Sequence, residues 1–142
     1  MTNGSALIDS AVPIYALGGD GPYKAACRAL MMRMATKTFR MYASVEMIQE
    51  LVHHRLRVTG DRRLAAADGR DTSAACTLLF FDREVLDLSL DLIERVPTIR
   101  GRDAVHAATA LAYGIDTIVS PDRAFDGISG LTRVDPRDFA IG

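Results

Sequence analysis

The chain has 142 residues, of which 49% are hydrophobic and 25% are charged, and its formal net charge is −1. This composition is that of an ordinary globular protein; it argues against a disordered chain and against a uniformly basic nucleic-acid-binding body, although a local basic patch stays open. Cys27 and Cys76 form no disulfide framework, no signal peptide is evident, and no apolar run approaches the roughly 18 residues needed to cross a bilayer. A cytoplasmic protein without a membrane segment is therefore expected.

Short apolar runs alternate with helical patterns along the whole chain, and glycine-rich breaks separate several of them. In chain order we expect a strand over 6–9, helices over 12–17 and 23–36, a strand over 38–43, a helix over 44–58, a helix or helical pair over 62–81 that is interrupted near Gly69, a strand over 84–88, a short helix from 89 to 96, a helix over 102–113, a strand over 117–120, a turn or short helix over 122–126, and a last strand over 131–134. Strands that alternate with helices predict a central, mostly parallel sheet in a three-layer α/β/α fold, as one domain over 1–142.

Two acidic residues lie at or just after the carboxyl ends of expected strands. Asp9 comes after the apolar run 6–8, and Asp122 comes shortly after the run 117–119. In open α/β folds, ligands bind in the crevice outside the carboxyl ends of the strands, so both carboxylates are candidates for a site there. The alternative is that each acid only caps the turn that follows it. Asp126 lies one helical turn after Asp122 and is a supplementary candidate.

Two further acids lie on helical stretches. Periodicity alone places Glu50 on a solvated face with Glu46, yet two glutamates spaced i,i+4 cost a helix about 0.2–0.5 kcal/mol, which is a mild hint of use. The helix dipole alone explains an acid at Asp103, in a first turn, but the small residues Ala107 and Ala110 on its face predict close packing there. Clustered carboxylates repel one another unless a cation lies between them, and oxygen ligands suit Mg²⁺ or Mn²⁺. Together the acids predict a metal-dependent phosphoryl-transfer site.

The motifs around these acids carry a family resemblance that covers nearly the whole chain. They resemble the PIN-domain ribonucleases, and among them the VapC-type toxins of bacterial toxin–antitoxin pairs, in the strings Leu7-Ile8-Asp9-Ser10, Ser44-x-x-x-x-Gln49-Glu50-Leu51, Gly101-Arg102-Asp103-Ala104-x-His106-Ala107-Ala108, Val119-Ser120-x-Asp122-Arg123-x-Phe125-Asp126 and Gly130-Leu131-x-Arg133-Val134. The resemblance implies a catalytic metal site made by Asp9, Glu50, Asp103 and Asp122, with Asp126 supplementary. Ser120 stands where the family often has threonine, and its hydroxyl is expected to support the site.

The resemblance also implies an activity and partners. It implies an endoribonuclease that depends on Mg²⁺ or Mn²⁺ and acts as the toxin of a type II toxin–antitoxin pair, with a cognate VapB-type antitoxin, an RNA substrate and a homodimeric state. The helix over 23–36 carries a leucine- and methionine-rich surface that is a candidate dimer face. No lysine or histidine is obviously placed as a general base, so the metal is expected to activate the water. His106 is expected to be an ordinary, satisfied helix residue.

Arginines are candidates for contacts to an RNA backbone. They cluster between the helices expected over 44–58 and 62–81, and they are Arg55, Arg57, Arg62, Arg63 and Arg70. Solvated helix faces, or contacts to a partner protein, explain them equally well. The chain has 6% aromatic residues and no aromatic stacking motif of the kind found in RNA-recognition sheets.

Other folds that gather acids around Mg²⁺ fit this chain less well. A receiver-type phosphoacceptor domain needs a second acid beside the first strand and a late lysine, but Ser10 follows Asp9 and no lysine follows Lys37. An Asp-x-Asp phosphatase fails because Ala11 stands where the second acid is required. A non-catalytic PIN-like scaffold would be expected to have lost one or more acids. A DNA-directed PIN-like nuclease stays open as the alternative within the enzyme class.

Overall fold

A parallel β-sheet forms the centre of the molecule. The computed structural model describes residues 5–36 and 40–139, and within them the strands follow the order β3-β2-β1-β4-β5. All four neighbouring pairs are parallel, which confirms the expected sheet. The strands are β1 (Ala6–Ile8), β2 (Met41–Ser44), β3 (Thr77–Leu79), β4 (Thr117–Val119) and β5 (Thr132–Val134).

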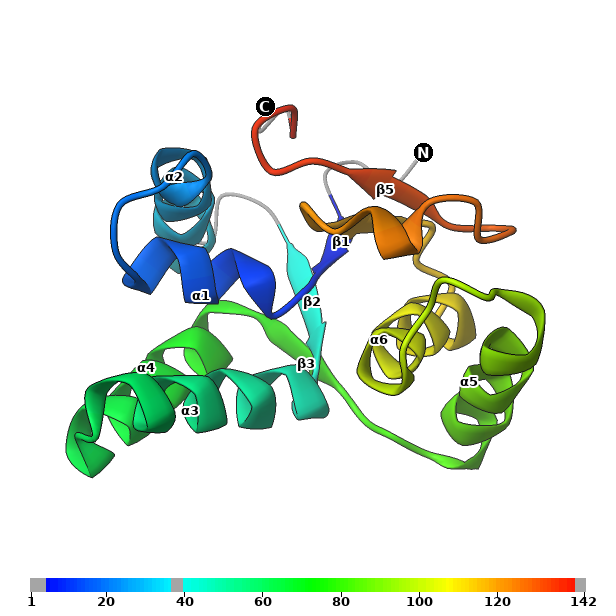
Figure 1. Ribbon diagram of the computed structural model, residues 1–142, viewed down its shortest axis with the longest axis horizontal. Coiled ribbons are helices and arrows are strands. Elements are labelled where there is room, and N and C mark those ends of the chain that lie inside the picture. The colour runs from blue at the N-terminus through cyan, green and yellow to red at the C-terminus, as the bar shows by residue number, and fades with distance from the viewer. Residues whose placement is uncertain (1–4, 37–39, 140–142) are drawn as a thin grey trace.

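Helices cover both faces of this sheet (Figure 1). One layer contains α1 (Ala11–Leu17), α2 (Lys24–Ala35), α3 (Val45–Thr59) and α4 (Arg62–Ala75), and the other contains α5 (Arg83–Arg95) and α6 (Gly101–Ala112). The alternation of β1 produces the two cores, because Leu7 packs with the α5–α6 layer while Ala6 and Ile8 pack with the layer of α1 to α3. A short 3-10 helix, η1 (Arg123–Phe125), lies between β4 and β5. The three-layer α/β/α prediction is confirmed.

Polar residues follow the carboxyl ends of the three central strands. Asp9 follows β1, Ser44 is the last residue of β2, and Ser120 follows β4. Because these strands are parallel neighbours, the three side chains meet at one edge of the sheet. Ser44 also caps α3 as expected, since its hydroxyl accepts a hydrogen bond from the Met47 N–H at 3.0 Å.

The segment 62–88 differs from the expectation. Helix α4 is uninterrupted at Gly69, where a Cβ would lie 2.5 Å from the Val52 Cγ2 of α3, so the glycine permits close helix packing rather than a break. The helix also ends at Ala75, and β3 follows at Thr77–Leu79. A strand of three residues is too short to show an alternating hydrophobic pattern in the sequence. The strand predicted over 84–88 is wrong. Asp82 caps a helix there, and Val85, Leu88 and Leu92 pack inward at helical spacing. The strand predicted over 38–43 begins outside the described residues and appears as β2.

Helix α5 presents apolar side chains to solvent on the side away from its buried face. Leu86, Leu90 and Ile93 are exposed, and Phe80 and Phe81 just before the helix are exposed as well. Positions i, i+4 and i+7 lie on one face of a helix, so the three aliphatic residues form a continuous stripe, called here the α5 stripe. Within the described part of the chain, none of the helices has the length and apolar character required to cross a membrane.

Candidate active site

Asp9 is the most buried acid at the sheet edge. One carboxylate oxygen, Oδ1, accepts the Ser10 N–H at 2.8 Å, and the other, Oδ2, accepts the Ser120 hydroxyl at 2.8 Å. Burial raises the pKa of Asp9 above its usual value, against the opposing effects of His106 and of these hydrogen bonds. The carboxylate is therefore fixed in orientation between two neighbouring strand ends.

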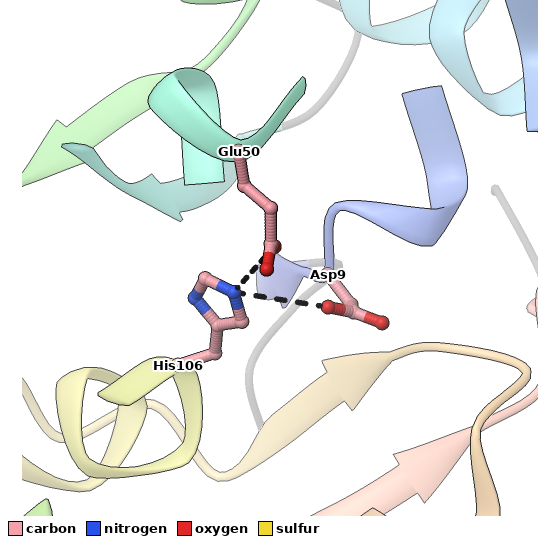
Figure 2. A group of neighbouring side chains, drawn as sticks. All are labelled: Asp9, Glu50 and His106. Carbon is pink, nitrogen blue, oxygen red and sulfur yellow. Dashed lines mark hydrogen bonds and ion pairs between the residues drawn. The ribbon is translucent and has the colours of Figure 1, made fainter. Parts of the chain in front are cut away.

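Glu50 reaches the same place from α3, and His106 reaches it from α6 (Figure 2). The His106 Nε2 lies 3.1 Å from Glu50 Oε1 and 4.0 Å from Asp9 Oδ1. The Glu50 side chain is only 18% exposed, so the solvated position that periodicity suggested is wrong. The polar face of α3 turns toward the start of α6 at this point, where Arg102 Nη1 also lies 3.6 Å from Glu50 Oε2. Burial alone would raise the pKa of Glu50, but the His106 hydrogen bond and the nearby cations lower it.

His106 is buried, and both of its ring nitrogens have partners. Nδ1 lies 2.9 Å from the Ser44 hydroxyl, whose oxygen already accepts the Met47 N–H, so the hydroxyl hydrogen is free to point at Nδ1. A neutral imidazole then carries its hydrogen on Nε2, facing Glu50. Burial would lower the pKa of His106, but the Glu50 hydrogen bond and the surrounding carboxylates raise it. In the neutral and the protonated form alike, Nε2 donates to Glu50.

Asp103 and Asp122 border the same site. Asp103 lies in the first turn of α6, half-buried, and its pKa rises to about 6 because of burial first and then because of the charges of Asp9, Asp122 and Glu50. Asp122 is exposed, and its Oδ1 accepts the Ala124 N–H at 2.9 Å, so it also caps η1. Asp9, Asp103 and Asp122 together line a cavity of about 520 Å³. Asp126 does not line it; its carboxylate pairs instead with Arg133, at 2.7 Å.

The donor atoms suit a hard divalent cation. Asp9, Glu50 and His106 each place one potential ligand atom within 4.8 Å of the others. The hydrogen on His106 Nε2 points at Glu50, which leaves carboxylate oxygens as the ligands, and oxygen ligands are those that Mg²⁺ and Mn²⁺ prefer. Burial raises the pKa of Asp103 most, and the nearby carboxylates of Asp9, Asp122 and Glu50 raise it further, as expected where acids gather without a cation. His106 is the residue that sequence reasoning missed, although its position three residues after Asp103 placed both on one face of α6.

The arginines do not form one surface. Arg55 is buried, and its Nε lies 2.9 Å from Asp68 Oδ2 on α4, so its expected availability to RNA is wrong. It lies on the inner face of α3 beside Leu51, where α3 and α4 pack together. Arg57, Arg62, Arg63 and Arg70 are exposed.

Comparison with known proteins gives concordant matches over most of the chain. The PIN domain family matches residues 6–131. Ribonuclease VapC7 of Mycobacterium tuberculosis is 35% identical over 132 residues, which are 92% of this chain and 90% of that protein.

Among solved structures, VapBC2 of Rickettsia felis, bound to a DNA fragment from its promoter, has a TM-score of 0.72 at 14% identity and covers 92% of this chain and 98% of that chain. Mycobacterium tuberculosis VapC20, a toxin that cleaves the sarcin–ricin loop, has a TM-score of 0.64 at 17% identity and covers 86% of this chain and 90% of that chain. At these identities the two structures establish the shared fold. With the matching family and the relative at 35% identity, the chain belongs to the PIN-domain family and, within it, to the VapC ribonucleases.

Proposed function

We propose that this protein is a divalent-metal-dependent endoribonuclease that acts as the toxin of a type II toxin–antitoxin pair. The observation that carries the proposal is the convergence of Asp9, Glu50 and Asp103 around one site, although they belong to β1, α3 and α6. The ribonuclease names of its relatives support RNA rather than DNA as the substrate.

The side chains have separate roles in this proposal. Asp9 and Asp103 are the central ligands of Mg²⁺ or Mn²⁺, and Glu50 and Asp122 complete the acidic site. A bound cation would supply the charge that lowers the pKa of an attacking water and neutralises the leaving oxygen. Ser120 orients Asp9 through its hydroxyl, and His106 orients Glu50 through its Nε2–H. Asp126 is left out of the proposed ligands, because its carboxylate pairs with Arg133 and does not line the cavity.

Three exposed arginines lie beyond Glu50, one near the end of α3 and two at the start of α4. A second cavity of about 340 Å³ adjoins the acids and is lined by Glu46, Gln49, Glu50, His53, Arg102, Val105 and His106. Arg57 lies seven residues after Glu50 on α3, which is about 10 Å along a helix axis. Arg62 and Arg63 follow in the first turn of α4. We assign this path to the RNA backbone, since the guanidinium groups can balance phosphate charge where the acids cannot.

Two protein partners belong to the same proposal. A cognate VapB-type antitoxin is inferred from the toxin–antitoxin complexes among the structural neighbours. A homodimer is inferred from the exposed apolar surface, and we assign its face to the α5 stripe rather than to the methionines of α2. On α2, Met34 is buried and Met31 partly buried, so Met32 is left as an isolated exposed methionine, whereas the α5 stripe is continuous.

Cleavage of total cellular RNA tests the nuclease activity. The purified chain is incubated with RNA in Mn²⁺, Mg²⁺ or EDTA, and the ends produced are mapped; cleavage is expected with either metal and none with EDTA. Asp103→Asn should abolish cleavage while circular dichroism shows an intact fold, and Asp87→Asn, an exposed acid on α5, should cleave like the parent. Full cleavage by folded Asp103→Asn would contradict the metal site. A single-stranded DNA of matched sequence tests the DNA-directed alternative.

Growth of bacteria tests the toxin assignment separately. Expression of the parent chain alone should arrest growth, and expression of Asp9→Asn at a matched soluble level should not, because the central ligand is lost. Equal growth with both proteins would favour a non-catalytic scaffold.

A further inference from the structure

The cavity at the acidic site has a second kind of wall. Besides Asp9, Asp103 and Asp122, its lining contains Tyr15 from the end of α1 and Tyr23 just before α2. The chain has only four tyrosines, so half of them line this one cavity. Its volume of about 520 Å³ falls in the range of about 300–1,000 Å³ that is usual for small-molecule sites.

The two tyrosine rings form a fixed pair. Their centroids are 5.6 Å apart and their planes differ by 17°, a stacked arrangement. The Tyr23 hydroxyl lies 3.2 Å from Asp135 Oδ2 and 3.1 Å from Arg137 Nη2, and the Arg137 guanidinium lies 4.3 Å from the centroid of the Tyr23 ring. Tyr23 is thus held from the C-terminal segment, and Tyr15 leans on it while remaining 43% exposed. An exposed aromatic ring with a rigid backing is a platform for a flat partner.

We propose that this cavity is a nucleobase subsite, in which Tyr15 stacks on an unpaired base of single-stranded RNA next to the phosphate held at the acidic site. The inference rests on the proposed function and specifies its substrate. A phosphate approaches the carboxylates only through a cation, whereas the apolar wall of Tyr15, Ile14 and Pro121 accepts a base without one. Stacking requires that the base be unpaired, so the subsite selects single strands and loops, and it is sequence-tolerant because every base has a flat face.

A side chain of a protein partner is the other occupant that an aromatic cavity can take. The RNA base is favoured because the stacking wall and the acids line the same cavity, so a nucleotide that occupies this cavity meets both. A base-stacking contact of this kind contributes about 1–3 kcal/mol, as judged by alanine substitution, which corresponds to roughly 5- to 140-fold in kcat/KM.

The test uses a single-stranded RNA oligonucleotide that carries a mapped cleavage site. Tyr15→Ala should lower kcat/KM by roughly 5- to 140-fold, while Tyr15→Phe, which keeps the ring, should stay within a factor of about two of the parent. Tyr113→Ala is the matched control, because Tyr113 is 40% exposed and lies at the end of α6 opposite Asp103. Melting temperatures of all variants show that the folded protein is compared.

Oligonucleotides with one abasic nucleotide on either side of the cleaved bond identify the contact. At the position that Tyr15 covers, an abasic nucleotide should lower the kcat/KM of the parent as much as Tyr15→Ala lowers it on intact RNA. Combining the abasic nucleotide with Tyr15→Ala should lower kcat/KM no further than either change alone. Cleavage by folded Tyr15→Ala at the parent rate would overturn the subsite. A decrease in kcat/KM from Tyr15→Ala that is equally large on intact and on abasic RNA would overturn it as well. Unchanged cleavage with lost antitoxin binding would assign the wall to the protein partner instead. Failure of the parent to cleave any RNA would overturn the proposed function itself.

Discussion

The folded structure disfavours the ionised form of Asp103. Its pKa is raised to about 6, because it is half-buried and faces the other carboxylates, whereas an unfolded aspartate titrates near about 3.9. The folded protein therefore binds this proton more tightly than the unfolded chain does. The corresponding stabilisation is complete below about pH 4 and is lost as the pH rises through about 6.

Asp103→Asn should therefore stabilise the metal-free protein at neutral pH. In EDTA at pH 7 its melting temperature should exceed that of the parent, and the difference should shrink toward zero below about pH 4. Mn²⁺ at 100 times its Kd stabilises a parent that binds one ion by about 2.7 kcal/mol, and the variant should lose most of this gain. Melting curves from pH 4 to pH 8 measure both effects, with Asp87→Asn as the control. A variant that keeps the full Mn²⁺ response would exclude Asp103 as a ligand.

His106 links the acidic site to the start of α3. It contacts Ser44 on one side and Glu50 on the other, and groups that orient metal ligands typically affect metal affinity by about 10- to 100-fold. His106→Asn should lower the affinity for Mn²⁺ by about that factor, because the shorter side chain cannot bridge both partners. The free Mn²⁺ signal in electron paramagnetic resonance measures it, and the exposed His53→Asn is the control. Tighter binding by His106→Asn would indicate that the positive charge of the imidazole, rather than its hydrogen bond to Glu50, determines how His106 affects the affinity for Mn²⁺.

Helices α3 and α4 are in close contact at Gly69. A Cβ at Gly69 would lie 2.5 Å from Val52 Cγ2, so Gly69→Ala should destabilise the protein through overpacking, by about 1–3 kcal/mol. In a Val52→Ala background the clash is removed, and the same substitution should stabilise by up to about 1 kcal/mol through helix propensity. Urea denaturation of the four proteins measures this inversion of sign. A destabilisation that persists beside Ala at position 52 would place the strain elsewhere.

The first turn of α4 belongs to the path that is assigned to the RNA backbone. Neutralising Arg62 and Arg63 together should weaken RNA binding and flatten its log–log salt dependence by about 0.7 for each lost contact to a single strand. Binding is measured on the catalytically inactive Asp103→Asn background. Neutralising Arg83, which is exposed on α5 in the other layer, should leave the slope unchanged. If the slope is also unchanged for Arg62 and Arg63, these arginines belong to another surface.

The association of two copies is the property that depends on the α5 stripe. Leu90 is 51% exposed at its centre, so Leu90→Asp should shift a dimer toward monomer by placing a charge in an apolar contact. Analytical ultracentrifugation across a range of concentrations measures the shift, and Met32→Asp on α2 is the matched control. A dimer that responds to Met32→Asp and not to Leu90→Asp would assign the interface to α2, as the sequence pattern suggested.

The sequence predicted the layered fold because its strands are short, apolar and regularly separated by helices. It also indicated the acids, since Asp9 and Asp122 follow strands and parallel strands bring their ends together. Periodicity failed where a local pattern had two solutions, as at 84–88, and at Glu50, whose polar helix face turns toward a partner helix. His106 could not be assigned because its role depends on Glu50 and Ser44, residues 56 and 62 positions away.

The connection between β2 and α3 determines which parts of the site can move. Ser44 is the last residue of the strand and Val45 is the first of the helix, so no linker residue separates them. Its hydroxyl caps the helix while its backbone pairs with β3, and such a junction has no hinge. Glu50, in the second turn of α3, therefore keeps its distance from the sheet. When a nucleotide enters, the wall that carries Glu50 is therefore expected to stay in place.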